Sequence, residues 1–505
     1  MAVRETERKY EATDTVELLD PVGLLGLDTG SGPEEQKLEA VYFDTADLRL
    51  IRAGVTLRRR TGGSDPGWHL KLPVDGDSSD ELRMPVGRSR RKPPAELVAL
   101  TRVHTRGAAL VPVAQLNTRR RRWVLAEDGQ ELAKLVEDRV TARTMGEQTR
   151  ALSWREVEVE LADHGQVELL DRIERQLLEV GVQRSKSRSK LGRLLAEEVS
   201  ARPAAPEAGA ASSAGDVVLA YLRTQAEQLR RYDPLVRRDV PDSVHQLRVA
   251  ARRMRSALQA FGRVIDRDRT RELTVELKWM AGELSGARDA EVMAGRFAAM
   301  LADLPEELVL GPVAAAVTRS FERRQAEARQ VALAALNSDR YLALHDTIDA
   351  LLTDPPFTGA AARPARRELP KSVARAYRRV ESCMCDADSQ VAGEQRDAAL
   401  HETRKAAKRL RYATEAVEPA LGKPAARLQR RLKKVQKLLG EHQDTVVSRP
   451  VLHELAVQAH LDGRNSFTYG LMHAAETARA DRAEQDLPAA WNRMRRPKST
   501  TWLKH

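Results

Sequence analysis

The chain has 505 residues, of which 31% are charged and 42% are hydrophobic, and Lys and Arg outnumber Asp and Glu by 84 to 73. This length predicts two to four domains of about 100 to 200 residues each, which excludes a single small module. No run approaches about 18 apolar residues and the start, MAVRETERKY, lacks an apolar block, so the sequence predicts a cytoplasmic protein without a membrane span.

The first 200 residues predict a mainly β domain. The runs ETERKYE, VTLRRR, WHLKLP and REVEVEL alternate with period two, and the turn-rich segments GGSDPG and DGDSSD lie between such runs. Helices are expected near residues 167–180 and before residue 200. In each strand one face is apolar and the other is ionised; the ionised faces carry Glu5, Glu7, Lys9, Arg58, Arg60, His69, Lys71, Glu156, Glu158 and Glu160.

A solvated face of an ordinary antiparallel sheet would explain one such strand. Several strands with acidic and basic clusters favour a closed barrel whose ionised faces point inward, because buried like charges need compensation. Arg and Lys hold phosphoryl oxygens directly, whereas carboxylates tolerate them only across a divalent metal. The barrel is therefore suited to a polyphosphorylated ligand.

The residues ETERK at 5–9 resemble the ExExK signature of the CYTH domain, the triphosphate tunnel metalloenzyme family. Supporting motifs follow in order over about 190 residues: YFDTADLRL at 42–50, LRRR at 57–60, HLKLP at 69–73, TRRRRW at 118–123, VED at 136–138, EVEVEL at 156–161 and SKL at 189–191. The resemblance implies an eight-stranded antiparallel barrel. It also implies a metal-dependent enzyme of the triphosphatase or adenylate cyclase class, although no feature indicates an adenine pocket.

The resemblance further implies roles for single residues. Mg²⁺ or Mn²⁺ is expected at Glu5, Glu7, Asp138, Glu156 and Glu158, with Glu160 as a further candidate. The triphosphate is expected at Lys9, Arg58, Arg60, Lys71, Arg120 and Lys190, where Arg119 or Arg121 could replace Arg120. Glu5, Glu7 and Lys9 form the expected catalytic group, and water oriented by the metal would attack a terminal phosphorus.

Residues 201–215, ARPAAPEAGAASSAG, predict a flexible linker between a domain at 1–200 and a second at 216–495. The second domain is Ala-, Leu- and Arg-rich with helical periodicity, which predicts an all-α fold. Its part of the chain holds 50 Lys and Arg against 38 Asp and Glu, whereas residues 1–215 hold 34 against 35. The two cysteines, Cys383 and Cys385, are expected to be reduced, without a disulfide or zinc site.

The helical part contains a repeat. VHQLRVAARRMRSAL at 244–258 matches LHETRKAAKRLRYAT at 400–414, and LKWMAGELSGARDAEVM at 277 matches LKKVQKLLGEHQDTVVS at 432. Each copy predicts a cationic stripe along one helix, formed by His245, Arg248, Arg252 and Arg255 and by His401, Arg404, Lys408 and Arg411. A solvated basic face is the alternative, but the repetition favours polyanion binding, with nearby cations keeping each His neutral until an anion arrives.

These stripes resemble the CHAD domain, a conserved-histidine α-helical domain often fused to CYTH domains, over about residues 216–495. The resemblance implies two four-helix bundles that bind inorganic polyphosphate. A further basic run is a candidate extension of that path or a solvated helix face: Arg427, Arg430, Arg431, Lys433, Lys434 and Lys437.

The leading hypothesis is an inorganic triphosphatase with an appended polyphosphate-binding domain. The alternative is a non-catalytic polyphosphate-binding or granule-associated protein. Nucleic acid is disfavoured as a partner, because aromatic residues make up only 4% of the chain and do not interleave with the basic stripes. The sequence makes no prediction of oligomeric state.

Overall fold

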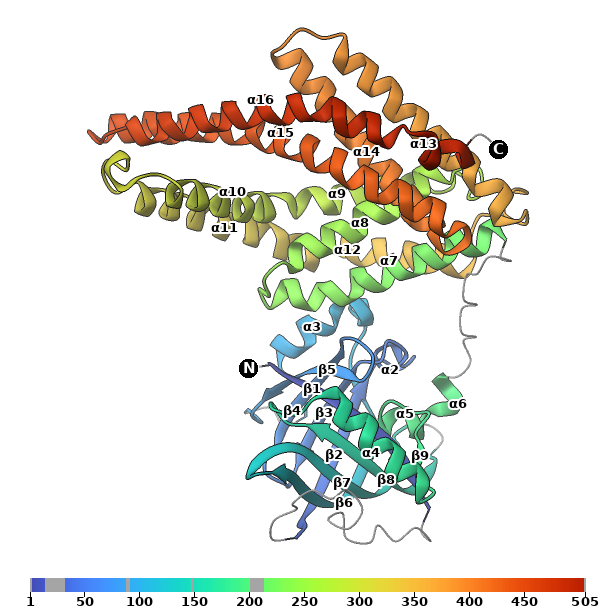
Figure 1. Ribbon diagram of the computed structural model, residues 1–505. Coiled ribbons are helices and arrows are strands. Elements are labelled where there is room, and N and C mark those ends of the chain that lie inside the picture. Colours follow the sequence, from blue (N-terminus) through green and yellow to red (C-terminus); the bar gives the residue numbers. More distant parts are fainter. Residues whose placement is uncertain (1, 14–31, 88–90, 147–148, 200–212, 504–505) are drawn as a thin grey trace. The chain divides into compact units, whose positions relative to one another are not determined.

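The computed structural model describes residues 2–13, 32–87, 91–146, 149–199 and 213–503 (Figure 1). The chain divides into two compact units, Met1–Ala204 and Ala205–His505. Most of the expected linker, 201–215, lies outside the described residues. Its last two residues instead begin helix α7, Ala214–Arg237, because Ser213 and Asp216 form a capping box in which each side chain accepts a bond from the other's backbone.

The N-terminal unit is a closed antiparallel barrel of eight strands, which confirms the predicted fold class. The strand order is β5-β4-β3-β2-β6-β7-β8-β1, and pairing of β5 with β1 closes the ring, while the short β9 pairs with β1 outside it. The strands are β1 (Ala2–Ala12), β2 (Glu34–Asp44), β3 (Thr56–Thr61), β4 (Gly67–Pro73), β5 (Ser78–Met84), β6 (Val111–Glu127), β7 (Gln130–Thr144), β8 (Ala151–Leu161) and β9 (Gln183–Arg184).

Helices cover the outside of the barrel. The predicted helix near 167–180 is α4, Val167–Glu179, and its Leu170, Ile173 and Leu177 are buried against outward-facing residues such as Trp123. On another side, α3 (Ala95–Thr105) and α2 (Arg49–Arg52) pack against apolar residues of β3 and β4. These contacts use the apolar faces of the strands and leave the ionised faces for the interior.

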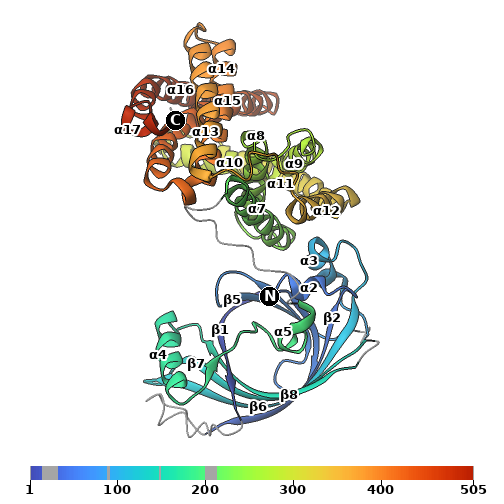
Figure 2. The same cartoon turned by 90° about the vertical axis from the view of Figure 1, so that its right-hand side faces the viewer.

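Helix α5, Lys190–Leu194, fills part of the barrel interior (Figure 2). Its Leu191 and Leu194 form a buried cluster with Leu116 and Val140, which lie on the same strand faces as the ionised residues further along β6 and β7. Ser189 caps the helix by accepting a bond from the backbone of Gly192 at 3.0 Å. The first residue of α5, Lys190, is thereby placed where the apolar cluster gives way to the charged lumen.

The second unit is all-helical, as predicted. Among the residues that the structure describes, no helix is long and apolar enough to cross a membrane. Its helices after α7 are α8 (Ser243–Ala260), α9 (Arg271–Glu283), α10 (Ser285–Ala302), α11 (Val313–Asn337), α12 (Asp339–Thr353), α13 (Ala365–Asp388), α14 (Glu394–Leu421), α15 (Lys423–Leu461), α16 (Phe467–Met494) and α17 (Pro497–Thr500). Helices α10 with α11 and α15 with α16 form two long hairpins (Figure 1).

The sequence repeat maps onto corresponding helices. The first motif lies on α8 and again on α14, which pack against each other. The second motif lies across α9 and α10 in the first copy and within the single 39-residue helix α15 in the second. The two predicted stripes therefore belong to neighbouring helices.

Candidate functional site

The barrel lumen gathers the ionised side chains of seven strands. Successive residues of a strand point to opposite faces, so residues two apart share the interior. The interior positions are Glu5, Glu7 and Lys9 of β1, Arg58 and Arg60 of β3, His69 and Lys71 of β4, Glu81 and Arg83 of β5, Arg120 of β6, Asp138 of β7, and Glu156 and Glu158 of β8, to which α5 adds Lys190.

Lys190 is the centre of an acidic triad. Its Nζ lies 2.8 Å from Asp138, 2.7 Å from Glu156 and 2.8 Å from Glu158, and carboxylate oxygens of these three buried residues lie within 4.8 Å of one another. Burial opposes the charged ammonium, but the carboxylates, Asp138 first, hold the pKa of Lys190 well above its ordinary value. The triad offers oxygen donors only, the donor set that Mg²⁺ and Mn²⁺ prefer.

Two further cations complete this cluster. Arg120 donates two hydrogen bonds to Asp138, at 2.8 and 2.7 Å, and one to Glu158 at 3.1 Å, while Lys9 donates to Glu158. Despite burial, Lys190 and Lys9 hold the pKa of Glu158 well below its ordinary value. Three carboxylates therefore face three cations, and the cluster is electrically balanced.

Glu5 and Glu7 lie on the other side of Lys9. Lys71 contacts both carboxylates, at 3.2 Å from Glu5, and Lys9 lies 3.1 Å from Glu7. Burial, and then the charge of Glu81, raises the pKa of Glu5 to about 7, even though Lys71 opposes the shift. The acidic side of the lumen is thus crowded enough that one carboxylate resists ionisation.

Sequence reasoning missed two lumen residues, Glu81 and Arg83. Glu81 accepts bonds from Arg83, from Arg58 at 3.3 Å and from His69 Nδ1 at 3.1 Å, and its side chain is 3% exposed. Arg83 also donates to Glu5 at 2.8 Å. The signal was present, because residues 78–84, SSDELRM, place Glu81 and Arg83 two apart on one strand face, as in the strands that were recognised.

Arg58 and Arg60 occupy adjacent interior positions of β3. Arg58 donates to the hydroxyl of Tyr42 at 3.3 Å, and Arg60 forms an ion pair with Asp65 in the loop after the strand. Burial, and then the like charge of Arg58, lowers the pKa of Arg60 to about 10. Two adjacent guanidiniums thus form the basic end of the lumen, with Glu81 and Asp65 as their carboxylate partners.

The predicted stripes of the helical unit contact acidic residues of other helices, which the sequence did not indicate. Arg248 lies 3.3 Å from Asp289, and Arg404, 156 residues later, lies 3.7 Å from Asp444. His401 pairs with Gln443. Each arginine therefore has a nearby carboxylate from the second repeated motif.

The two stripes meet between α8 and α14. Arg252 of α8 donates to the hydroxyl of Tyr412 on α14 at 3.3 Å. Burial, and then the charges of Arg404 and Arg252, lowers the pKa of Lys408 to about 7. Burial, and then Arg288, also lowers the pKa of His245. The predicted stripe residues thus form a partly buried cationic surface that spans both repeats.

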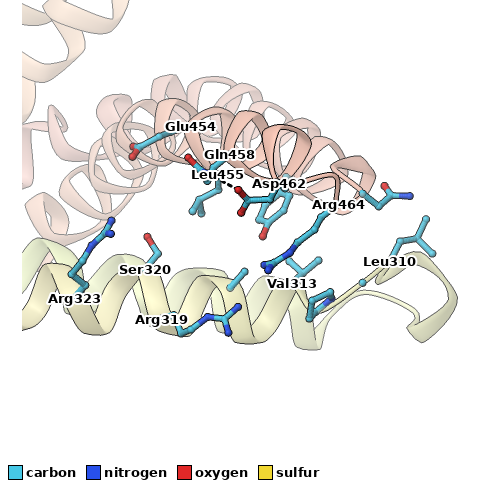
Figure 3. Close-up of a pocket in the computed structure, with 16 residues that line it drawn as sticks. Leu310, Val313, Arg319, Ser320, Arg323, Glu454, Leu455, Gln458, Asp462 and Arg464 are labelled. Carbon is cyan, nitrogen blue, oxygen red and sulfur yellow. Dashed lines mark hydrogen bonds between the residues drawn. The ribbon is translucent and has the colours of Figure 1, made fainter.

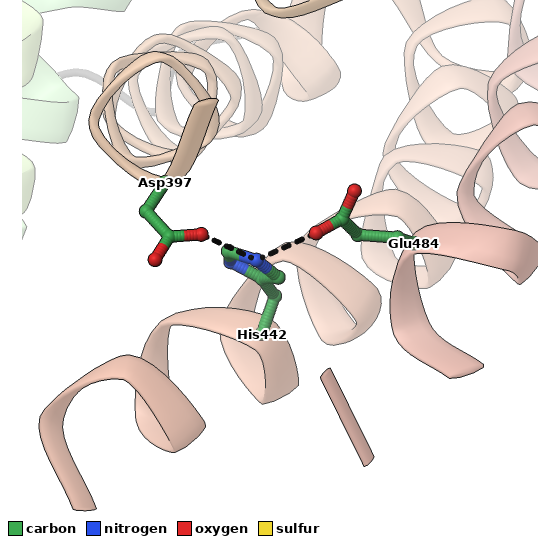
Figure 4. Close-up of side chains that lie close together, drawn as sticks. All are labelled: Asp397, His442 and Glu484. Atoms are coloured by element: carbon green, nitrogen blue, oxygen red, sulfur yellow. Dashed lines mark hydrogen bonds and ion pairs between the residues drawn. The ribbon is translucent and has the colours of Figure 1, made fainter. Parts of the chain in front are cut away.

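A second acidic cluster, Asp397, His442 and Glu484, joins α14, α15 and α16 (Figure 4). His442 Nε2 lies 3.3 Å from Asp397 and 3.1 Å from Glu484. Arg449 and Arg396 contact the outer oxygens of these carboxylates, at 3.5 and 2.6 Å. The two arginines balance the two carboxylates, so the charges of this cluster do not require a divalent ion.

A pocket of about 510 Å³ lies between α11 and the α15–α16 hairpin (Figure 3). Its lining combines apolar side chains, such as Leu455 and Tyr469, with Arg319, Arg323 and Arg464. None of the sixteen lining residues drawn belongs to the predicted stripes. The pocket is therefore a separate feature of the helical unit.

Family comparison matches residues 3–193 to the CYTH domain and residues 220–453 to the CHAD domain. Two uncharacterized proteins of Mycobacterium tuberculosis, MT2285 and Rv2226, are each 36% identical to this chain over 97% of its length and 96% of theirs. The chain belongs to the CYTH–CHAD family. CYTH domains are metal-dependent and act on triphosphates as triphosphatases or cyclases, and CHAD domains are associated with polyphosphate.

Solved structures resemble parts of this CYTH–CHAD protein. PptA from Streptomyces chartreusis is 24% identical, with a TM-score of 0.48 over 56% of this chain and 100% of that one. The CHAD domain from the plant Ricinus communis is 25% identical, with a TM-score of 0.44 over 60% and 96%. The putative adenylyl cyclase HpAC1 from Hippeastrum, described with a dominant triphosphatase activity, is 15% identical, with a TM-score of 0.25 over 39% and 96%.

Within the CYTH domain, ion pairs join all eleven tunnel residues named in the sequence prediction into one network. At the basic end, Asp65 joins Arg60 to Arg83, and Glu81 joins Arg83 to Arg58. From Arg83 the ion pairs continue through Glu5, Lys71 and Glu7 to Lys9. From Lys9 they continue through Glu158, Arg120, Asp138 and Lys190 to Glu156. Of the arginines in TRRRRW, Arg120 joins this network through Asp138 and Glu158, whereas Arg121 stacks over Trp123, 5.0 Å from the ring centre. Glu160 of β8 lies opposite Glu7 of β1 in the strand register, and burial raises the pKa of Glu160.

Proposed function

We propose that the CYTH domain hydrolyses short phosphate chains, inorganic triphosphate first among them, and that the CHAD domain binds polyphosphate. The observation that carries this proposal is the continuous ion-pair network of the lumen. It joins cations suited to phosphoryl oxygens with carboxylates suited to a divalent ion. Buried charges at this density are stable only when each has a partner, so a ligand that brings both phosphate and metal can replace the internal pairs.

The exchange of partners explains how a balanced cluster can bind a charged ligand. Lys9, Arg120 and Lys190 would transfer from carboxylates to phosphoryl oxygens, which leaves three uncompensated negative charges on the triad. Mg²⁺ or Mn²⁺ fits that position, held by Asp138, Glu156 and Glu158. Glu5 and Glu7 of β1 would be the further ligands that the CYTH signature implies. When bound, the ion would reduce the charge of the phosphates and lower the pKa of coordinated water.

The remaining residues position the chain. Arg58, Arg60 and Lys71 provide fixed donors along β3 and β4, and would neutralise the charge that develops on the departing diphosphate. Lys9 lies between Glu7 and Glu158, where it would hold a phosphate close to both carboxylates. The lumen would thus supply orientation and electrostatic stabilisation without a covalent intermediate.

The test is phosphate release from triphosphate with Mg²⁺ or Mn²⁺ and with a chelator. A Glu5→Ala, Glu7→Ala double variant is expected to lose at least about a hundredfold in turnover, because two carboxylates of the metal site are removed. Glu168→Ala, on the exposed side of α4, is the matched acidic control and should keep full activity. Unchanged turnover in the double variant would refute the assignment.

The same assay separates the enzyme from its alternative. Triphosphate, nucleoside triphosphates, thiamine triphosphate and long polyphosphate should be compared as substrates. Tight binding of polyphosphate without release of phosphate from any of them would show a non-catalytic, granule-associated protein. Displacement of polyphosphate by DNA or RNA at equal phosphate concentration would favour a nucleic-acid partner instead.

A further inference from the structure

The loop between β3 and β4, residues 62–66, directs a carboxylate onto two lumen arginines. The carboxylate of Asp65 pairs with Arg60 through one oxygen and lies 3.5 Å from Arg83 Nη1 through the other. Its backbone carbonyl lies 3.0 Å from His69 Nε2. Three lumen side chains therefore contact this one loop residue.

The loop is packed tightly against the neighbouring strand β2. Gly62 has a φ of +77°, and a Cβ at this position would lie 2.1 Å from the backbone oxygen of Lys37. Gly63 has a φ of +70°, and a Cβ there would lie 2.6 Å from the side chain of Leu38. Only glycine fits these two positions, so the loop backbone makes a tight turn against β2 just before Asp65.

The ion pairs around Asp65 indicate that its carboxylate takes the place of an anionic ligand. Arg83 already has Glu5 at 2.8 Å and contacts Glu81, whereas Arg60 forms its ion pair with Asp65. Arg60 and Arg58 occupy adjacent interior positions of β3, so two like charges lie close together. A carboxylate held on a guanidinium in this way occupies the position that a phosphoryl oxygen would take.

We propose that Asp65 is a built-in competitor for the anionic ligand of the tunnel. Its carboxylate occupies Arg60 and Arg83 and sets an upper limit on how tightly this part of the lumen holds a phosphate chain. This inference rests on the proposed function, because it takes the tunnel to bind such a chain. The residue determines affinity and is not one of the reacting groups.

A competing role and a positioning role of Asp65 predict opposite changes in ligand affinity when its charge is removed. If Asp65 competes, its neutralisation removes one negative charge close to the bound phosphate and strengthens binding. If Asp65 instead orients Arg60 for the substrate, its neutralisation weakens binding, because the guanidinium loses its support. Asp65→Asn keeps the size and planar shape of the side chain but removes its charge and one of its two acceptor oxygens, so it separates the two roles.

The experiment measures KM and kcat for triphosphate in the full chain. Asp65→Asn is expected to lower KM roughly fivefold, the effect of two unit charges about 4 Å apart that are screened as in bulk water, with kcat changed by less than about twofold. Asp65→Glu, which restores the charge, should return KM toward the unsubstituted value. Asp47→Asn, in which the lost carboxylate pairs with Arg49 at 2.7 Å outside the lumen, should leave KM unchanged. An unchanged or raised KM in Asp65→Asn would overturn the inference.

The inference is testable even if the protein does not hydrolyse triphosphate. Binding of triphosphate is then measured by calorimetry in the presence of a chelator, and Arg60→Gln identifies the part of the signal that belongs to the tunnel. Stronger tunnel binding in Asp65→Asn would support the inference while the proposed hydrolysis fails. Binding that is equal or weaker in this variant, with thermal unfolding unchanged, would exclude competition by Asp65.

Discussion

Arg404 of α14 lies 3.7 Å from Asp444 of α15, and Arg248 of α8 lies 3.3 Å from Asp289 of α10. The two pairs are separated by 156 and 155 residues, the offsets of the sequence repeat. Each copy of the repeat thus places a cation of its first motif beside a carboxylate of its second. The contact is longer and less direct in the second copy, which leaves Arg404 better able to accept an external anion.

Arg404→Gln is expected to weaken polyphosphate binding about three- to tenfold and to reduce its dependence on salt, because one cation is removed from the joined stripes. Lys405→Gln is the matched control, since this adjacent residue is exposed and pairs with Glu402 away from the stripe. Titration with a labelled polyphosphate at several salt concentrations measures the affinity and its salt dependence for each variant. Equal losses in the two variants would indicate a general charge effect rather than a defined surface.

Polyphosphate binding should weaken as pH rises through about 7. Lys408 faces Arg404, Arg252, Arg411 and Asp444, and its pKa of about 7 means that it carries its charge below this pH and loses it above. A bound phosphate raises that pKa, so binding is accompanied by proton uptake near neutral pH. Between pH 6 and pH 9, the polyphosphate affinity of Lys408→Arg should vary less than that of the unsubstituted protein. An identical pH profile in the variant and the unsubstituted protein would show that Lys408 does not cause the pH dependence.

Lys190→Ala should destabilise the CYTH domain by about 3 to 5 kcal/mol, because it leaves buried carboxylates without their shared cation. Mg²⁺ or Mn²⁺ should raise the melting temperature of this variant more than that of the unsubstituted protein, since the ion can replace the lost charge. Lys186→Ala, on the exposed segment before α5, is the control. A variant that melts normally without added metal would show that the triad does not need Lys190.

His442→Ala should lower the free energy of unfolding by about 1 to 3 kcal/mol, because Asp397 and Glu484 lose their common hydrogen-bond donor. A chelator should leave the melting temperature unchanged, since Arg396 and Arg449 already balance the two carboxylates. His453→Ala, exposed on the same helix, should have little effect. A drop in melting temperature on chelation that His442→Ala abolishes would instead indicate a bound metal.

Much of the fold follows from local patterns that the chain carries in short windows. Period-two alternation placed Glu5, Glu7 and Lys9 on one face of β1, and the same rule applied to residues 78–84 would have added Glu81 and Arg83. The position of Arg120 within four consecutive arginines was left open, because a strand's register depends on its partners. In the β6–β7 pairing Arg120 lies opposite Asp138, which places its side chain in the lumen.

The sequence by itself determined that the first domain segregates charge from apolar residues, that the second repeats a cationic helix, and that the two differ in net charge. The tertiary structure alone decided which charges meet: that Lys190 enters the barrel on α5, that Asp65 lies on Arg60, and that the stripes of α8 and α14 join. The physical reason is that periodicity specifies a residue's face through bonds to its neighbours. Contacts between residues far apart in the chain depend on strand register, barrel closure and helix packing, which form only when the whole domain folds.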